Sequence, residues 1–73
     1  EIELGIAEYV KLIIYDINGR QVKELANGSY GKGSHTFTWN SRDDYGNIVS
    51  SGMYIYQLIS STQVSTQKML LLK

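Results

Sequence analysis

The sequence is short and has a formal net charge of zero, which limits the classes of protein to which the chain can belong. Its 73 residues leave room for one domain, 1–73, with a single small core. Seven basic and seven acidic residues cancel, so the composition shows no electrostatic footprint for nucleic acid or for an anionic membrane surface. No apolar run approaches the roughly 20 residues of a membrane span. Cysteine is absent, which excludes a disulfide framework and a cysteine-based zinc site.

The first half of the sequence predicts a β-hairpin. In 9–16, YVKLIIYD, apolar residues recur at every second position, which is the side-chain period of a strand. Asn18 and Gly19 tolerate the positive φ of a tight turn, and 21–25 then resumes the alternation. The following segment, 26–33, holds three of the seven glycines and predicts a loop.

A third strand is predicted over 34–39, SHTFTW. Phe37 and Trp39 share one face of it, and threonines occupy the other. We expect Trp39 to lie at the centre of the core. The polar segment 40–47, NSRDDYGN, is rich in residues that favour turns and predicts a surface loop.

The end of the sequence predicts two more strands. In 53–60, MYIYQLIS, both faces carry apolar residues, which is typical of a central strand. The segment 64–73, VSTQKMLLLK, also has apolar residues on both faces, so we expect it to be covered on both sides. A helix over 68–72 is an alternative, but the apolar run is short and β-forming residues precede it.

Turn signals recur about every eight to twelve residues, and no amphipathic helix of adequate length is present. The six tyrosines and one tryptophan also suit pleated, half-buried surfaces. The sequence therefore predicts an all-β chain, a small immunoglobulin-like antiparallel β-sandwich of about six to seven strands.

A set of short motifs resembles one known family over nearly the whole length. The family pattern is a strand ending in Tyr-Asp, a Gly-Arg turn, a histidine before a tryptophan, an aspartate-rich glycine turn, Ser-Gly-x-Tyr and a final Lys-Met strand. It is the immunoglobulin-like domain related to that of the flagellar hook-capping protein, which overlaps the type A C-terminal sorting domain of type IX secretion. The matching residues are Tyr15-Asp16, Gly19-Arg20, His35, Trp39, Asp43-Asp44, Gly46, Ser51-Gly52, Tyr54 and Lys68-Met69.

This resemblance implies a non-catalytic C-terminal module of a larger exported bacterial protein, secreted or held at the cell surface. The implied partners are the secretion machinery or neighbouring domains of the parent protein, with no membrane insertion. The segment expected to contact the partner comprises Lys68, Met69, Leu70, Leu71, Leu72 and Lys73.

The chain departs from the family pattern in two places. The longer family form has a further strand ahead of this sequence, and only EIELGIA stands there, so an edge strand is expected to be missing or reduced. Ser41 stands where the family commonly has glycine after the tryptophan, which leaves the geometry of that turn open.

Candidate catalytic and metal-binding residues are few. His35 is the only histidine, so neither a histidine metal cluster nor a nucleophilic triad has support, and a structural hydrogen bond is favoured. Asp43 and Asp44 do not meet the spacing of a calcium loop, which favours a role in the turn. We therefore expect no catalytic residue, no metal and no cofactor.

The tyrosines raise a second hypothesis, because exposed aromatic rings can stack on sugars. Tyr54 and Tyr56 share a face with Leu58, which favours packing in the core. Tyr30 and Tyr45 are expected in loops and are the candidates for stacking on a ligand. An accessory structural or carbohydrate-binding domain beside a catalytic module is thus the alternative function.

Overall fold

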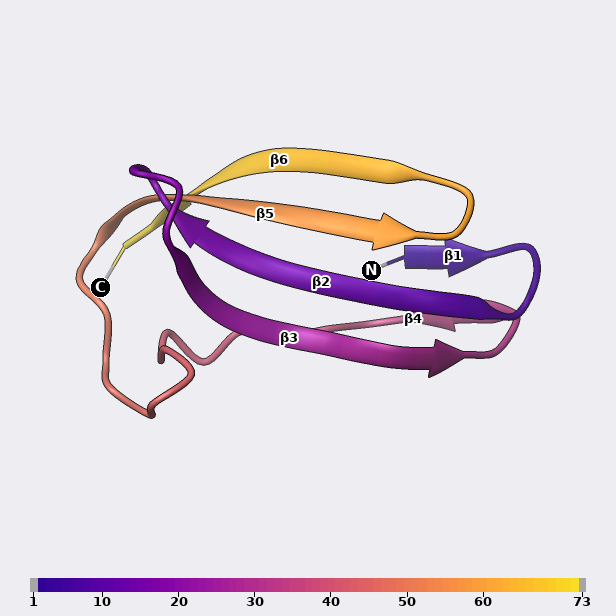
Figure 1. Cartoon of the computed structure of the whole chain (residues 1–73). Coiled ribbons are helices and arrows are strands. Elements are labelled where there is room, and N and C mark those ends of the chain that lie inside the picture. The colour runs from indigo at the N-terminus through magenta and orange to yellow at the C-terminus, as the bar shows by residue number, and fades with distance from the viewer. Residues whose placement is uncertain (1, 73) are drawn as a thin grey trace.

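The computed structural model describes residues 2–72, and the strands of that part form two antiparallel sheets (Figure 1). One sheet has four strands in the order β3-β2-β5-β6, and the other pairs β1 with β4. This arrangement confirms the predicted all-β sandwich. The strands are β1 (Ile2–Leu4), β2 (Glu8–Asp16), β3 (Gln21–Tyr30), β4 (Gly33–His35), β5 (Gly52–Ser60) and β6 (Val64–Leu71).

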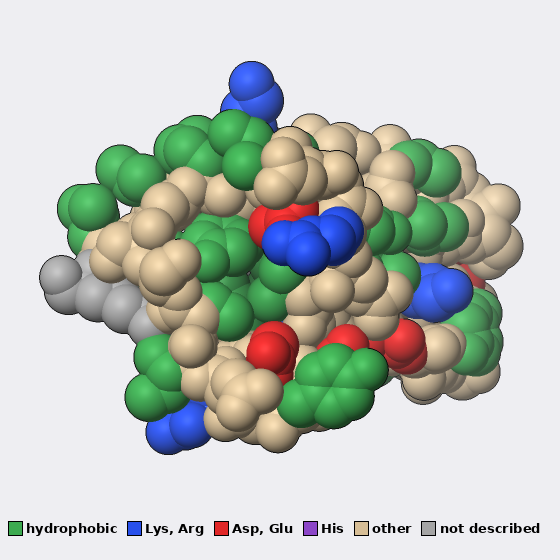
Figure 2. Space-filling view, turned by 60° about the vertical axis from the view of Figure 1, so that its left-hand side comes forward, with side chains coloured by type: hydrophobic (Ala, Val, Ile, Leu, Met, Phe, Trp, Pro, Cys, Tyr) green, Lys and Arg blue, Asp and Glu red, His purple; other side chains and the backbone are tan. Residues whose placement is uncertain are grey.

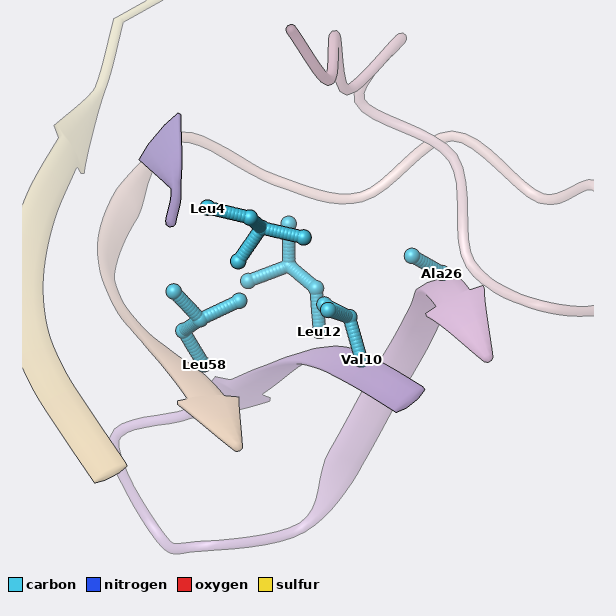
Figure 3. Packing of buried hydrophobic residues seen from close by; sticks show 5 residues of the cluster. All are labelled: Leu4, Val10, Leu12, Ala26 and Leu58. Carbon is cyan, nitrogen blue, oxygen red and sulfur yellow. The ribbon is translucent and has the colours of Figure 1, made fainter. Parts of the chain in front are cut away.

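The core lies between the two sheets and is built from aliphatic side chains. Leu12 of β2 stands directly opposite Leu58 of β5 in the sheet register, so their side chains point to the same face. Leu4 of β1 comes down onto this pair from the smaller sheet (Figure 3). The buried cluster comprises Leu4, Val10, Leu12, Ala26 and Leu58.

The hairpin between β2 and β3 forms as predicted. The carboxylate of Asp16 accepts hydrogen bonds from the backbone N–H groups of Asn18 and Arg20, at 2.9 and 3.0 Å. Gly19 takes φ 86°, a conformation that costs an L-residue about 1–2 kcal/mol. The hydrogen bonds to Asp16 and the positive φ of Gly19 therefore position this turn.

The loop predicted over 26–33 is wrong for its first five residues. β3 continues through Tyr30 and pairs with β2 along its whole length. Ala26 is buried opposite Leu12, and the Tyr9 hydroxyl donates a hydrogen bond to the side chain of Asn27. Pairing with β2 therefore outweighs the turn preference of the Asn-Gly-Ser sequence. Two irregularities in the register accommodate the extra length of β3.

The position predicted for Trp39 is also wrong. The strand expected over 34–39 ends at His35, and Trp39 follows in irregular chain, only partly buried. Its indole Nε1–H donates to the carbonyl of Arg42 at 2.8 Å, and its ring packs against Tyr54. A buried indole needs a partner for its N–H, and the local loop supplies one at the margin of the core. Aliphatic residues of β2 fill the centre instead, with Ile14 only 1% exposed.

β5 is a central strand, as predicted, and lies between β2 and β6. Residues 64–71 form a strand and not a helix, which confirms the preferred interpretation. The expectation that this last strand is covered on both sides is wrong. Within residues 2–72, β6 is an edge strand with one neighbour, and Leu70 on its outer face is 60% exposed. The alternation of apolar residues predicted the strand, but it does not determine whether one or both faces of the strand are covered.

Both departures from the family pattern have a structural counterpart. The strand at the start of the chain, β1, is present but only three residues long. Ser41 adopts φ 64°, the left-handed conformation that glycine occupies without strain. The turn after Trp39 therefore keeps a geometry suited to glycine although the residue is serine.

Candidate functional site

The segment expected to contact a partner, Lys68–Leu72, runs along the edge of the larger sheet. Its residues alternate between the two faces of that sheet. Met69 and Leu71 turn inward and are partly buried, whereas Leu70 and Leu72 turn outward and are 60% and 77% exposed. Lys73 lies outside the described residues. Leu70 and Leu72 thus form an apolar stripe at the end of β6, a strand whose second edge has no partner among residues 2–72.

A groove opens on the inner side of the same strand, and we call it the inner groove. Its volume is about 350 Å³, and strands of both sheets line it. The lining residues come mainly from the two sheets and include part of the core: Ile2, Leu12, Ile14, Leu25, Phe37, Trp39, Tyr56, Leu58, Ser65, Gln67 and Met69. The floor is largely apolar, and none of its described lining residues carries a charge. Sequence periodicity gave no signal for this groove.

The two candidate stacking tyrosines are not brought together. Tyr30 lies at the end of β3, not in the predicted loop, and its ring packs edge to face against His35 and Phe37 at 5.2 and 5.5 Å. Tyr45 is 90% exposed in the loop that packs against the start of β3. The loop that carries Tyr45 contacts β3 at Glu24. Tyr30 lies six residues further along the same strand, a separation of about 20 Å from Glu24.

The aspartates after Trp39 organise their own loop. Asp43 accepts hydrogen bonds from the backbone N–H groups of Tyr45 and Asn47, both at 2.9 Å. This is the turn role that the sequence favoured. Among residues 2–72, no group of three or more histidine, cysteine, aspartate or glutamate side chains could hold a metal ion.

Asp44 fastens this loop to the edge of β3. Its backbone N–H donates to the carbonyl of Val22, and its carboxylate accepts the backbone N–H of Glu24 at 3.0 Å. That hydrogen bond from Glu24 lowers the pKa of Asp44, and the side chains of Gln21 and Lys23 add to the effect. The first half of the β3 edge is therefore occupied by the protein's own loop.

A wide cleft of about 680 Å³ opens where this loop meets the β2–β3 turn. Figure 2 shows this end of the molecule, where acidic and basic side chains lie beside a hollow with hydrophobic side chains inside it. Asp16 and Asp44 line the cleft, and both already accept backbone hydrogen bonds. The Arg20 Nε also donates to Asp16, at 3.1 Å. The charged groups of the cleft thus serve the two turns that they belong to.

His35 has the structural role that the sequence favoured. Its Nε2–H donates to the carbonyl of Gly31 at 2.7 Å, and its ring contacts Tyr30. This bond closes the turn between β3 and β4. No helix in the described part of the chain has the length and apolar character to cross a membrane.

The comparisons with known proteins agree with this architecture. A search of curated proteins and a search of solved structures gave no match. The family model of the FlgD Ig-like domain, by contrast, matches residues 4–64, which include β2 to β5 and every residue of the buried cluster. The match covers most of the sequence and names a fold of the same kind as the observed sandwich. The chain therefore belongs to the FlgD Ig-like domain family, as a structural Ig-like module.

Proposed function

We propose that this module directs the sorting or surface attachment of a larger exported bacterial protein, without catalysis of its own. One observation carries the proposal: the segment Lys68–Leu72 presents one exposed leucine within the edge strand β6, Leu70, and a second directly after it, Leu72. Leu70 and Leu72 leave most of their side-chain surface in water. Exposed apolar residues that lie together on one element mark interaction sites more often than scattered ones do.

The position of this segment suits recognition by another protein. An edge strand offers unpaired backbone N–H and C=O groups, and the outward leucines add apolar contacts beside them. A receptor of the secretion machinery, or a neighbouring domain of the parent protein, would read both features together. Lys68 lies on the same outward face as Leu70 and supplies a positive charge next to the apolar stripe.

The test is export of a reporter fused ahead of the module in a bacterium that has type IX secretion. Leu70→Ser combined with Leu72→Ser should retain the reporter inside the cell, because the stripe is lost while the inward residues are kept. Ile48→Ser, which changes another exposed apolar residue in a loop, serves as the matched control and should be exported normally. Deletion of 68–73 should also stop export.

Circular dichroism and resistance to protease separate loss of sorting from loss of folding. If the folded double variant is exported as well as the parent module, the sorting role is wrong. If Ile48→Ser blocks export equally, recognition does not depend on the stripe of β6. Either result would leave the family membership untouched and remove the proposed role.

A second function is favoured by one observation only, the 90% exposure of the Tyr45 ring. A ring in that position could stack on a sugar, and the module would then hold a glycan beside a catalytic domain. A glycan array read with Tyr45→Ala and with the unchanged protein tests this alternative. A signal that persists in Tyr45→Ala would exclude Tyr45, and no signal with either protein would exclude carbohydrate binding.

A further inference from the structure

The two sheets are very unequal in size. β2, β3, β5 and β6 have eight to ten residues each, whereas β1 and β4 have three each. β4 lies towards β3, where His35 contacts Tyr30. β1 lies above β2 and β5, where Leu4 meets Leu58 (Figures 1 and 3). Figure 1 draws β1 and β4 beside β5, β2 and β3, and neither of them over β6.

The inner groove occupies this uncovered place. Ile2 of β1 and Ser65, Gln67 and Met69 of β6 are among its lining residues. Tyr56 lies in the floor and donates its hydroxyl to Gln67 at 3.3 Å. Burial of such an apolar floor is favourable at about 25 cal/mol per Å² removed from water. Because its described lining residues are uncharged, the groove favours neutral and apolar groups over charged ones.

The wall of the groove also offers hydrogen bonds. β1 pairs with β4 through Ile2, Glu3 and Leu4, and it has no second strand neighbour in the described chain. No strand of residues 2–72 pairs with the other edge of β1, so the N–H and C=O groups that point to this edge are open to a further strand. An extended peptide satisfies such an edge and an apolar floor at once, since its backbone pairs with the edge and alternate side chains point down.

We propose that the inner groove binds an extended peptide of a partner protein, which adds a strand to β1. Alternate apolar side chains of the peptide pack on Tyr56 and Met69, and the smaller sheet grows to three strands above β5 and β6. A small molecule would fill the floor but leave the edge of β1 unpaired. This inference deepens the proposed interaction role, because it names a second surface and the chemistry of its partner.

The experiment uses the whole chain, labelled with ¹⁵N, and a synthetic peptide, Lys-Thr-Val-Thr-Val-Thr-Val-Lys. A control peptide has every valine replaced by aspartate. The first peptide should shift the amide signals of Ile2, Glu3 and Leu4 together with those of 65–69, and the control peptide should shift neither set. Slower hydrogen exchange of the β1 amides on binding should accompany these shifts.

Two matched variants locate the binding. Gln67→Trp places an indole in the groove and should weaken binding by at least about tenfold, the factor that about 1.4 kcal/mol represents. Lys68→Trp places the same group on the outer face of the adjacent residue and should bind as the parent does. Both positions are exposed, so the fold tolerates each change, as circular dichroism can verify.

Absence of binding by the valine peptide would overturn the proposal. So would equal loss of binding in the two tryptophan variants, or shifts in β6 without shifts in β1, which would indicate pairing along the outer edge of β6. The peptide result is separate from the export result. Binding can fail while sorting through Leu70 and Leu72 succeeds, and sorting can fail while the groove still binds.

Discussion

The indole of Trp39 meets the ring of Tyr54 edge to face, with ring centroids 5.2 Å apart. Trp39 lies in irregular chain and Tyr54 in the central strand β5, so this contact ties the long loop to the larger sheet. The Tyr54 hydroxyl also donates to the carbonyl of Ser50 at 2.7 Å. The pair therefore holds both ends of the loop against the sandwich.

A double-mutant cycle should detect this contact. Trp39→Leu and Tyr54→Leu should each lower the free energy of unfolding. Their effects should couple by about 1 kcal/mol, because each single substitution already removes the aromatic contact. Urea denaturation of the four proteins measures the coupling. Additivity within about 0.3 kcal/mol would mean that the rings contribute through burial alone.

Ser41→Gly should stabilise the protein. Ser41 has φ 64°, which is strained for a residue with a Cβ by about 1–2 kcal/mol, while glycine loses part of that gain through its freer unfolded chain. We expect a net gain of about 0.5–1 kcal/mol in thermal or urea denaturation. Ser41→Ala keeps the Cβ and should show no gain. A destabilised Ser41→Gly would indicate that the serine side chain itself supports the turn.

Gly19→Ala should destabilise the hairpin turn by about 1 kcal/mol or more, because φ there is 86°. Gly31→Ala is the matched control, since a Cβ at either position would meet no atom within 4 Å and Gly31 has no left-handed φ. The control should stay within about 0.5 kcal/mol of the parent protein. Equal effects at the two positions would contradict the conformational explanation.

Asp44 should make the protein sensitive to acid. Hydrogen bonds from Glu24 and Gln21 lower its pKa in the folded protein below the ordinary value of 3.8. Its contribution to stability is therefore complete above about pH 5, and it is lost as the pH falls through the folded pKa.

Asp44→Asn should show a smaller fall in melting temperature between about pH 5 and pH 2, since asparagine can still accept from the Glu24 N–H but does not titrate. Melting curves at several pH values test this. Asp44→Ala, which loses the acceptor as well, should be less stable than the parent at neutral pH. An unchanged acid dependence in Asp44→Asn would assign the effect to other carboxylates.

Local patterns predicted the parts of the fold that depend on neighbouring residues. Alternation around Leu12 and Leu58 identified two strands and their buried faces, and Asn18-Gly19 identified the hairpin turn. The position of a residue relative to the two packed sheets could not be predicted from such local patterns. The position of Trp39 follows from the early end of β4 at His35, which no local propensity indicates.

The same distinction between local patterns and the assembled fold applies to the candidate functional residues. The family resemblance singled out the segment 68–73, and the structure adds which of its described residues face outward. Tyr30 was misplaced because β2 recruits the Asn27-Gly28-Ser29 segment into the sheet. The inner groove was missed because it arises from the mismatch between a four-stranded and a two-stranded sheet. That mismatch is a property of the assembled sandwich and of no single segment.

The loop fastened by Asp44 has a consequence for self-association. A second copy approaching along β3 meets that loop, whereas the long border of β6 is open. Endless head-to-tail growth through the larger sheet requires both borders to be accessible. Because the loop occupies the first half of the β3 border, the open border of β6 favours a union of β6 with β6, which closes on itself after two copies. The loop fastened by Asp44 thus works against head-to-tail growth through the larger sheet.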